Sequence, residues 1–450
     1  MKILLISPAV SKSKRTVKEL MMPQLALYIL EGLTPDHHEV KIVEEEVQPI
    51  NFDESCDLVA ISCMTANAPR AYEVAKEFKS KGKTVVMGGV HPTILPDEAL
   101  QYADAVVIGE AEGVWEKLLE DHTAGTLNKT YHDPAPDLSR YVKKDFTKIL
   151  KKRLFSIVPI MTSRGCPYNC DFCCVTDLFG KKIRHIPIEN IVKDIKVSGS
   201  RNFMFLDDNI IGHQKYAKEL FRALIPLKIK WVGQASISFL KETELLQLAA
   251  DSGCKVLFIG LESVNEVQMK TLKKSLKDNA ELKLTMKKIK KMGILIHASM
   301  IFGFDTDTKK VFRETVKFLI KAKISTVSFN ILTPYPGTKT YDDLKRAGRL
   351  LTNDWKYYDH NTVVFSPQNM SPLELQIGKI MARARFYRKF SFLKRLLGNL
   401  NSPILFMATN YGHMKQTKVE QRRFAGLKME LFDQYPYTTS EPEQSGVQRS

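Results

Sequence analysis

The sequence lacks any apolar run that approaches the roughly 20 residues of a membrane-spanning helix. Its opening, MKILLISPAV, leads directly into the basic stretch SKSKR without the small-residue cleavage site of a signal peptide. It also lacks a disulfide framework, because it has only seven cysteines in 450 residues and four of them lie between positions 166 and 174. These absences predict a cytoplasmic protein in a reducing compartment that uses its clustered cysteines to bind a metal.

Acidic residues are in deficit, with 50 Asp and Glu against 67 Lys and Arg, which gives a net charge of +17. Such an excess attracts phosphates, nucleic acid or anionic lipid, although lysines on solvent-facing helices are the alternative explanation. From Phe386, the stretch FYRKFSFLKRLLGNLNSPILF interleaves apolar residues with Arg and Lys. It predicts either an interfacial helix with peripheral membrane contact or a helix packed against the rest of the chain.

The first 125 residues alternate short apolar runs with helical patterns, which is typical of a doubly wound parallel sheet with its ligand site at the carboxyl ends of the strands. We expect strands at residues 2–7, 38–45, 57–62, 83–89 and 104–110. Residues 126–152 are polar and contain Gly, Pro and Asn, so they predict a linker.

A second series of strands and helices occupies residues 153–338 and predicts a partial βα barrel of six units, with its chemistry at the strand carboxyl ends. Its expected strands are residues 157–163, 202–208, 230–236, 255–263, 295–304 and 326–334. Residues 339–435 predict a mostly helical domain, and residues 436–450 a disordered tail. The predicted fold class is therefore α/β, with a Rossmann-like domain, a partial barrel and a helical C-terminal region.

Within SRGCPYNCDFCC, the spacing of Cys166, Cys170 and Cys173 lets three thiolates converge on three corners of a cubane iron-sulfur cluster. The fourth iron would have no protein ligand and could chelate a substrate. A structural zinc site is closed by four ligands. Zinc would therefore need Cys174 or His185 as a fourth ligand, and the chain has no second CxxC pair. We interpret Cys174 as a small residue beside the loop.

The same segment resembles the signature of the radical S-adenosylmethionine superfamily. The resemblance implies a 4Fe-4S cluster held by Cys166, Cys170 and Cys173, with Phe172 shielding it near the adenine. It also implies that Asp207, Asp208 and Asn209, after the second barrel strand, receive the methionine amino group, with capping of the loop as the alternative. Further along the chain, it implies that Glu262 contacts the ribose and that Gly303 packs beside the adenosine. TPYPGT, residues 333–338, resembles the end of the sixth strand in members with an N-terminal cobalamin domain.

The segments GGVHPTILPDEAL and DAVVIGEAEGVW resemble that cobalamin-binding domain. Glycines at strand ends let a backbone approach a flat corrin closely, so Gly88, Gly89 and Gly109 are candidates, with tight turns as the alternative. His91 lies on the same predicted edge. The motif Asp-x-His-x2-Gly, which supplies an axial histidine in other cobalamin proteins, is absent after the first strand.

The resemblance implies an enzyme that cleaves S-adenosylmethionine to a radical and, with methylcobalamin, methylates an unactivated carbon of a lipid, isoprenoid or pigment-like substrate. It implies an electron donor of the flavodoxin or ferredoxin type. The alternative within the same architecture is a cyclase or a carbon-carbon bond-forming enzyme. An RNA-modifying methylthiotransferase or a nucleic-acid-binding metal protein is disfavoured, because the sequence has no second cysteine trio and no RNA-recognition aromatic motif.

Overall fold

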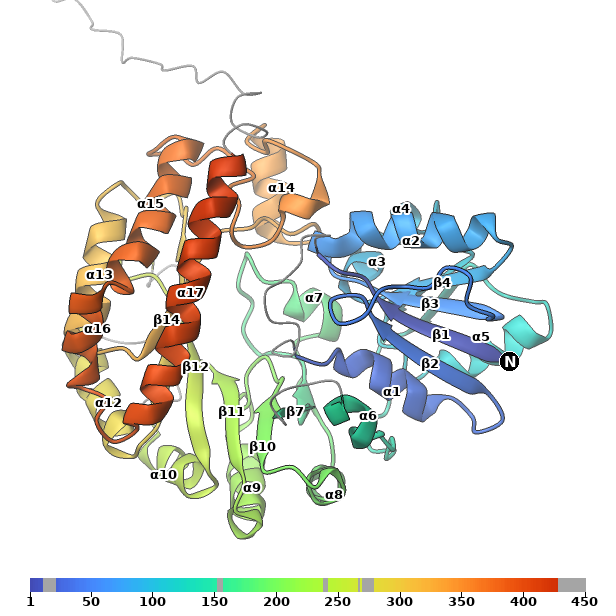
Figure 1. Ribbon diagram of the computed structural model, residues 1–450, viewed down its shortest axis with the longest axis horizontal. Helices are drawn as coiled ribbons and strands as arrows, with labels where there is room; N and C mark the ends of the chain where they lie inside the picture. The colour runs from blue at the N-terminus through green and yellow to red at the C-terminus, as the bar shows by residue number, and fades with distance from the viewer. Residues whose placement is uncertain (11–21, 152–156, 238–241, 266–267, 269–278, 428–450) are drawn as a thin grey trace, which may run out of the picture.

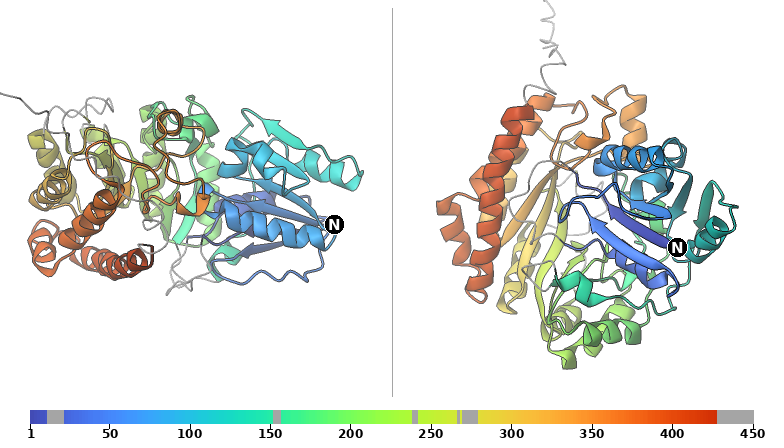
Figure 2. Two further views of the ribbon diagram at one scale, coloured as in Figure 1. Left: turned by 90° about the horizontal axis from the view of Figure 1, so that it is seen from above. Right: turned by 45° about the vertical axis from the view of Figure 1, so that its right-hand side comes forward.

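The computed structural model describes residues 1–10, 22–151, 157–237, 242–265, 268 and 279–427. The structure contains two parallel sheets with helices packed on them. A group of C-terminal helices covers the flank of the second sheet that lies away from the first sheet (Figures 1 and 2). No helix among these residues is both long enough and apolar enough to cross a membrane.

The first sheet has six parallel strands in the order β2-β1-β3-β4-β5-β6. Its strands are β1 (Lys2–Ser7), β2 (Glu39–Glu44), β3 (Leu58–Ser62), β4 (Thr84–Gly88), β5 (Ala105–Gly109) and β6 (Thr130–Asp133). Successive side chains of a strand point to opposite faces, so two separate cores form. This confirms the predicted doubly wound sheet.

Helices cover both faces of the first sheet. Leu5 belongs to the core under α1 (Leu25–Leu33) and α5 (Trp115–Thr123), whereas Leu4 belongs to the core under α2 (Ala68–Ser80). Three short helices complete this part of the chain: η2 (Thr65–Asn67), α3 (Val90–Ile94) and α4 (Pro96–Ala99).

The sheet continues beyond the domain boundary expected at residue 125, because β6 pairs in parallel with β5. Tyr131 anchors this strand: its ring is buried and its hydroxyl donates to Asp121 over 2.9 Å. Tyr131 is the only large apolar side chain of the strand, which is why the sequence resembles a linker here. The rest of the expected linker includes helix α6 (Phe146–Lys151).

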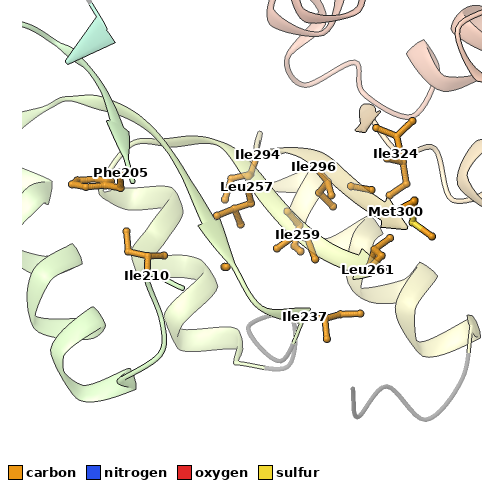
Figure 3. Close-up of a cluster of buried hydrophobic side chains, with 14 of the residues drawn as sticks. Phe205, Ile210, Ile237, Leu257, Ile259, Leu261, Ile294, Ile296, Met300 and Ile324 are labelled. Atoms are coloured by element: carbon orange, nitrogen blue, oxygen red, sulfur yellow. The ribbon is translucent and has the colours of Figure 1, made fainter. Parts of the chain in front are cut away.

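The second sheet also has six parallel strands, and neighbours in the sheet follow one another along the chain. They are β7 (Ile157–Ile160), β10 (Asn202–Phe205), β11 (Lys230–Ala235), β12 (Cys254–Glu262), β13 (Leu295–Phe302) and β14 (Thr326–Ile331). The connecting helices are α8 (Ile188–Ser198), α9 (Gln214–Leu224), η3 (Ile225–Leu227), α10 (Thr243–Asp251), α12 (Asn279–Lys291) and α13 (Val311–Lys321). Side chains such as Leu257, Ile259 and Ile296 fill the core (Figure 3). The predicted six βα units are confirmed.

The C-terminal region contains α14 (Lys339–Arg346), η5 (Trp355–Tyr357), α15 (Pro372–Phe386), α16 (Lys389–Leu396) and α17 (Pro403–Leu427). Ser371 begins α15 with a capping box, in which its hydroxyl accepts from the amide of Glu374 and the Glu374 carboxylate accepts from the amide of Ser371. Between α14 and α15 the chain is largely irregular, which interrupts the expected helical region. The predicted disordered tail, 436–450, lies outside the described residues.

Candidate functional site

The carboxyl edges of the two sheets border one cavity of about 940 Å³. Ser7, Ser62, Gly88 and Gly109, the last residues of four strands of the first sheet, line one side. The second sheet lines the other side with residues that include Glu262 at the end of β12. This volume is at the upper end of the range for ligand pockets, about 300–1,000 Å³. The chemistry was predicted at the carboxyl ends of the strands, and this cavity lies there.

The cysteine loop is bracketed by a small antiparallel pair, β8 (Ser163–Arg164) with β9 (Arg184–His185). It begins at Gly165, where φ is +94° and a side chain would collide with the carbonyl oxygen of Lys182. The amide of Cys173 donates to the carbonyl of Cys170 over 2.9 Å, and helix α7 (Val175–Phe179) follows. The pairing of β8 with β9 thus holds the loop against the cavity.

The donors of this loop have the chemistry that an iron-sulfur cluster requires, namely three thiols on one short segment. Cys173 and the neighbouring Cys174 line the cavity, whereas Cys166 and Cys170 are half-buried behind it. Burial raises the pKa of the Cys173 thiol to about 12, so metal binding there must displace a proton. Across the described part of the chain, no three His, Cys, Asp or Glu side chains are gathered tightly enough to hold a metal ion. The three thiols share one short loop beside the cavity.

Phe172 lines the cavity next to Cys173. Its ring meets that of Phe304 edge-on, with 6.2 Å between the ring centroids. An aromatic pair at this position keeps water away from the cavity side of the loop. This is consistent with the shielding role that the sequence predicts for Phe172.

Two of the polar residues after β10 hydrogen-bond to neighbouring strand ends. Asp207 is buried behind the cavity lining and accepts hydrogen bonds from the hydroxyls of Thr162 and Ser163, each at 2.6 Å. Asn209 is also buried, and its side-chain oxygen accepts from the amide of Ser236 over 3.0 Å. Both therefore tie neighbouring strand ends together, and their contact with the methionine amino group stays a prediction.

Asp208 is half-buried and also lies outside the cavity lining. Burial and, second, the negative charge of Asp207 raise its pKa to about 6. Of the three acidic and amide side chains of this loop, Asp208 keeps the most solvent exposure.

Glu262 ends β12 on the cavity, where the sequence places it, in a left-handed conformation with φ +61°. The register between β12 and β13 shifts at this point, and the shift imposes the conformation. A non-glycine residue in this region is strained, and such strain clusters at functional sites. Gly303 is not part of the cavity lining, and a side chain there would meet Phe365 and Leu375, so its contact with the adenosine stays a prediction.

The predicted glycines of the first sheet reach the cavity. Gly89 has φ +95° and Gly109 has φ +80°, and both line the cavity together with Gly88. His91 does not: its ring is fully buried, its Nε2 lies 3.2 Å from the carboxylate of Glu98, and the ring packs edge-on against Trp355. His91 lies on α3 outside the cavity lining, and its role at the ligand stays a prediction.

We expect Gly89→Ala to lower both stability and cobalamin retention. A Cβ at this position would lie 2.6 Å from the carbonyl oxygen of Cys63, in addition to the cost of the positive φ. Gly82→Ala is the matched control, because Gly82 has φ +72° and no neighbouring atom within 4 Å. The free energy of unfolding should fall by at least about 1 kcal/mol more for Gly89→Ala, and the purified protein should retain less cobalt. Equal losses for the two variants would contradict the close packing at Gly89.

A buried ion-pair network joins the first sheet to the bracket of the cysteine loop. Arg164 pairs with Glu110 and Glu112, which follow β5, and Arg184 pairs with Glu110. Burial opposes ionisation, but Arg164 holds the pKa of Glu112 below its usual range, and Glu112 with Glu110 raises the pKa of Arg164. The network fixes the cysteine loop relative to the first domain.

A further group of cavity residues, Asp359, His360 and Asn361, lies in the irregular segment after α14 and was not predicted from the sequence. Tyr335 hydrogen-bonds His360 Nε2 over 3.0 Å, and Asp359 and Asn361 line the cavity beside them. Burial lowers the pKa of His360, which keeps its imidazole neutral near pH 7. His360 also has φ +61°. The sequence feature that could have identified this group is the histidine at the end of WKYYDH, which lies in a stretch predicted to be mostly helical.

Comparison with known proteins agrees with this arrangement. Residues 160–319 match the family model for the radical SAM superfamily, and residues 15–119 match that for the B12 binding domain. The bacteriochlorophyllide d C-12(1)-methyltransferase of Chlorobaculum tepidum is 31% identical over 411 residues, which cover 88% of this chain and 90% of that protein. The hopanoid C-2 methylase of Rhodopseudomonas palustris is 24% identical over 74% of this chain and 66% of that protein.

Among solved structures, the radical S-adenosylmethionine methyltransferase TsrM from Kitasatospora setae superposes with a TM-score of 0.68 at 14% identity, over 94% of this chain and 99% of that chain. This likeness shows that the two proteins share a fold. The parallel sheet, the partial barrel and the terminal helices therefore occur in the same combination in that solved structure. The two family models and the 31% identity to the bacteriochlorophyllide methyltransferase show that the chain belongs to the radical SAM superfamily, as an enzyme with a B12-binding domain whose cofactors are a 4Fe-4S cluster, S-adenosylmethionine and cobalamin.

Proposed function

We propose that the protein methylates an unactivated carbon of an apolar substrate held between its two sheets. One observation carries this proposal: a single cavity reaches both Cys173 and Phe172 on one side and Gly88, Gly89 and Gly109 on the other. When bound, the cluster with S-adenosylmethionine supplies a hydrogen-abstracting radical, and cobalamin supplies the methyl group. A substrate in this cavity would lie within reach of both chemistries.

The residues of the chain position the reactants and exclude water. Cys166, Cys170 and Cys173 would hold the cluster, and the strand-end glycines would admit the corrin. Phe172 covers the side of the cavity next to the cysteine loop. Hydrogen bonds to His360 and to the carbonyl of Tyr358 hold the hydroxyl of Tyr335, which gives the cavity a polar group in a fixed position. A dry cavity protects a carbon radical from side reactions with water.

The lining favours an apolar substrate. Aliphatic side chains reach the cavity from helices α1 and α7 and from the second sheet: Ile29, Leu30, Leu178, Ile301, Ile331 and Leu332. The names of two relatives, a bacteriochlorophyllide methyltransferase and a hopanoid methylase, state a pigment and a lipid as substrates. We therefore place the substrate in the lipid, isoprenoid or pigment class.

We also propose two partners. A cluster that must be reduced needs a one-electron donor of the flavodoxin or ferredoxin type, and the net charge of +17 favours an acidic one. Lipid and pigment substrates reside in membranes, so the protein would act in peripheral contact with a membrane surface.

The test is transfer of a labelled methyl group. The reduced holoenzyme is incubated with methyl-deuterated S-adenosylmethionine and an organic extract of cells from which the gene has been deleted. We expect a lipid or pigment that gains the label, with 5′-deoxyadenosine formed in the same sample. If 5′-deoxyadenosine forms but every product is unlabelled, the methylation proposal fails and the cyclisation or coupling alternative takes its place.

A further inference from the structure

The C-terminal helices expose a series of large apolar side chains. Phe390 and Leu397 on or next to α16 are 68% and 70% exposed, and Ile404 on α17 is 78% exposed. We call the following seven residues the C-terminal apolar surface: Phe390, Leu393, Leu397, Leu400, Ile404, Met407 and Tyr411. Their spacing of three and four residues places those of each helix on one face. Monomeric proteins rarely expose so many large apolar side chains together.

The opposite faces of the same helices are firmly packed, so this surface is not a loosely attached segment. Arg395 is fully buried, donates to the carbonyl of Ser325 over 2.5 Å and to Asn410 Oδ1 over 2.9 Å, and lies 4.0 Å above the ring of Phe386. Phe406 is fully buried in a core with Val256 and Leu295. The alternative of a helix packed against the rest of the chain is thus realised on the buried faces of these helices.

The charge of the segment that carries this surface has one sign. No Asp or Glu occurs between Glu374 and Glu420. The exposed side chains of the segment include the following cations: Arg385, Arg388, Lys389, Lys394, Lys415 and Lys418. The ammonium of Lys394 lies over the ring of Phe390 at 4.3 Å, so charge and apolar contact are adjacent. Apolar side chains with basic neighbours on the same helices complement a bilayer that contains anionic lipids. A second copy of the same surface would bring like charges together.

The surface lies at the other end of the barrel strands from the cavity. The side chain of Asn401 donates to the carbonyls of Lys290 and Lys291, and Ser402 donates to the carbonyl of Gly293, just before β13 begins. The cavity instead contacts Ile301, near the end of β13. The helices also lie on the flank away from the first domain (Figures 1 and 2). Changes to this surface should therefore leave the cofactor sites intact.

We propose that the C-terminal apolar surface docks the protein on anionic lipid bilayers. The apolar side chains enter the headgroup region, and the neighbouring Lys and Arg side chains bind the lipid phosphates. The inference deepens the proposed membrane contact and rests on that part of the proposed function. It does not depend on methyl transfer.

The experiment is flotation of the holoenzyme with vesicles of phosphatidylcholine, with and without phosphatidylglycerol, in the absence of S-adenosylmethionine. We expect flotation with anionic vesicles that weakens as salt is raised. The double variant Leu397→Ser/Ile404→Ser should bind at least about tenfold more weakly. Val197→Ser/Ile225→Ser, which changes exposed apolar residues elsewhere, should bind as the wild type does. Iron and cobalt contents report whether each variant is folded.

A second variant, Lys389→Gln/Lys394→Gln, changes only charge and should lose affinity for anionic vesicles specifically. Failure of the wild type to float with anionic vesicles overturns the proposal, as does equal binding by the two serine double variants. A dimer in solution that Leu397→Ser/Ile404→Ser dissociates, without vesicle binding, identifies a second copy as the occupant and also overturns it. Since no methyl donor is present, failure of docking is distinguishable from failure of the methylation proposal.

Discussion

Cys173→Ala is expected to abolish cleavage of S-adenosylmethionine and to strip the protein of most of its iron. A cubane cluster held by three thiolates loses one of its ligands, and Cys173 is the ligand candidate that lines the cavity. Formation of 5′-deoxyadenosine under reducing, anaerobic conditions should fall at least about a thousandfold. The measurement is iron per chain together with 5′-deoxyadenosine by chromatography.

Cys174→Ala is the matched control for this change. Cys174 also borders the cavity, but it occupies the position at which α7 begins, outside the spacing of the three ligand candidates. This variant should keep its iron and most of its activity. If Cys174→Ala lost as much iron as Cys173→Ala, the assignment of the three ligands would have to be changed.

Glu110→Gln should destabilise the protein by about 3–5 kcal/mol, because it removes the carboxylate that both Arg164 and Arg184 share in a buried network. The side chains of Glu110 and Arg164 are 4% and 9% exposed, so water cannot replace the lost charge. Arg164 would then keep Glu112, whereas Arg184 would lose the carboxylate with which it pairs. The measurement is the free energy of unfolding of the holoenzyme by chemical denaturation.

The control is Glu116→Gln, which breaks the ion pair with Arg140. Those side chains are 44% and 61% exposed, so this loss should be under about 1 kcal/mol. Because the network ties the first domain to the bracket of the cysteine loop, Glu110→Gln should also lower iron content, whereas Glu116→Gln should not. Equal stabilities for the two variants would show that the network does not hold the domains together.

Most strands were predictable because each is a short apolar run, and β1 to β5 also end in Ser, Glu or Gly, as KILLIS and TVVMG do. Strand β6 was not, since Thr130–Asp133 carries one large apolar side chain, Tyr131, and forms only because the edge of β5 is available to pair. The series of βα units predicted that the chemistry lies at the carboxyl ends of the strands, where the cavity is found.

Side-chain direction was harder to predict than position along the chain. The sequence places Asp207 correctly after β10, but the direction of its carboxylate depends on the hydroxyls of Thr162 and Ser163, donated by another strand end. His91 is displaced from the cavity by the contact with Trp355, which is distant in sequence. Contacts between distant segments set these orientations, and local pattern does not encode them.

The central claim, that this chain pairs a 4Fe-4S cluster with cobalamin across one cavity, is tested most directly by anaerobic purification followed by metal analysis and spectroscopy. The claim predicts four irons and one cobalt per chain, with a cluster whose electron paramagnetic resonance signal changes when S-adenosylmethionine is added. Zinc in place of iron, or protein that binds iron but takes up no cobalt when supplied with cobalamin, would contradict it.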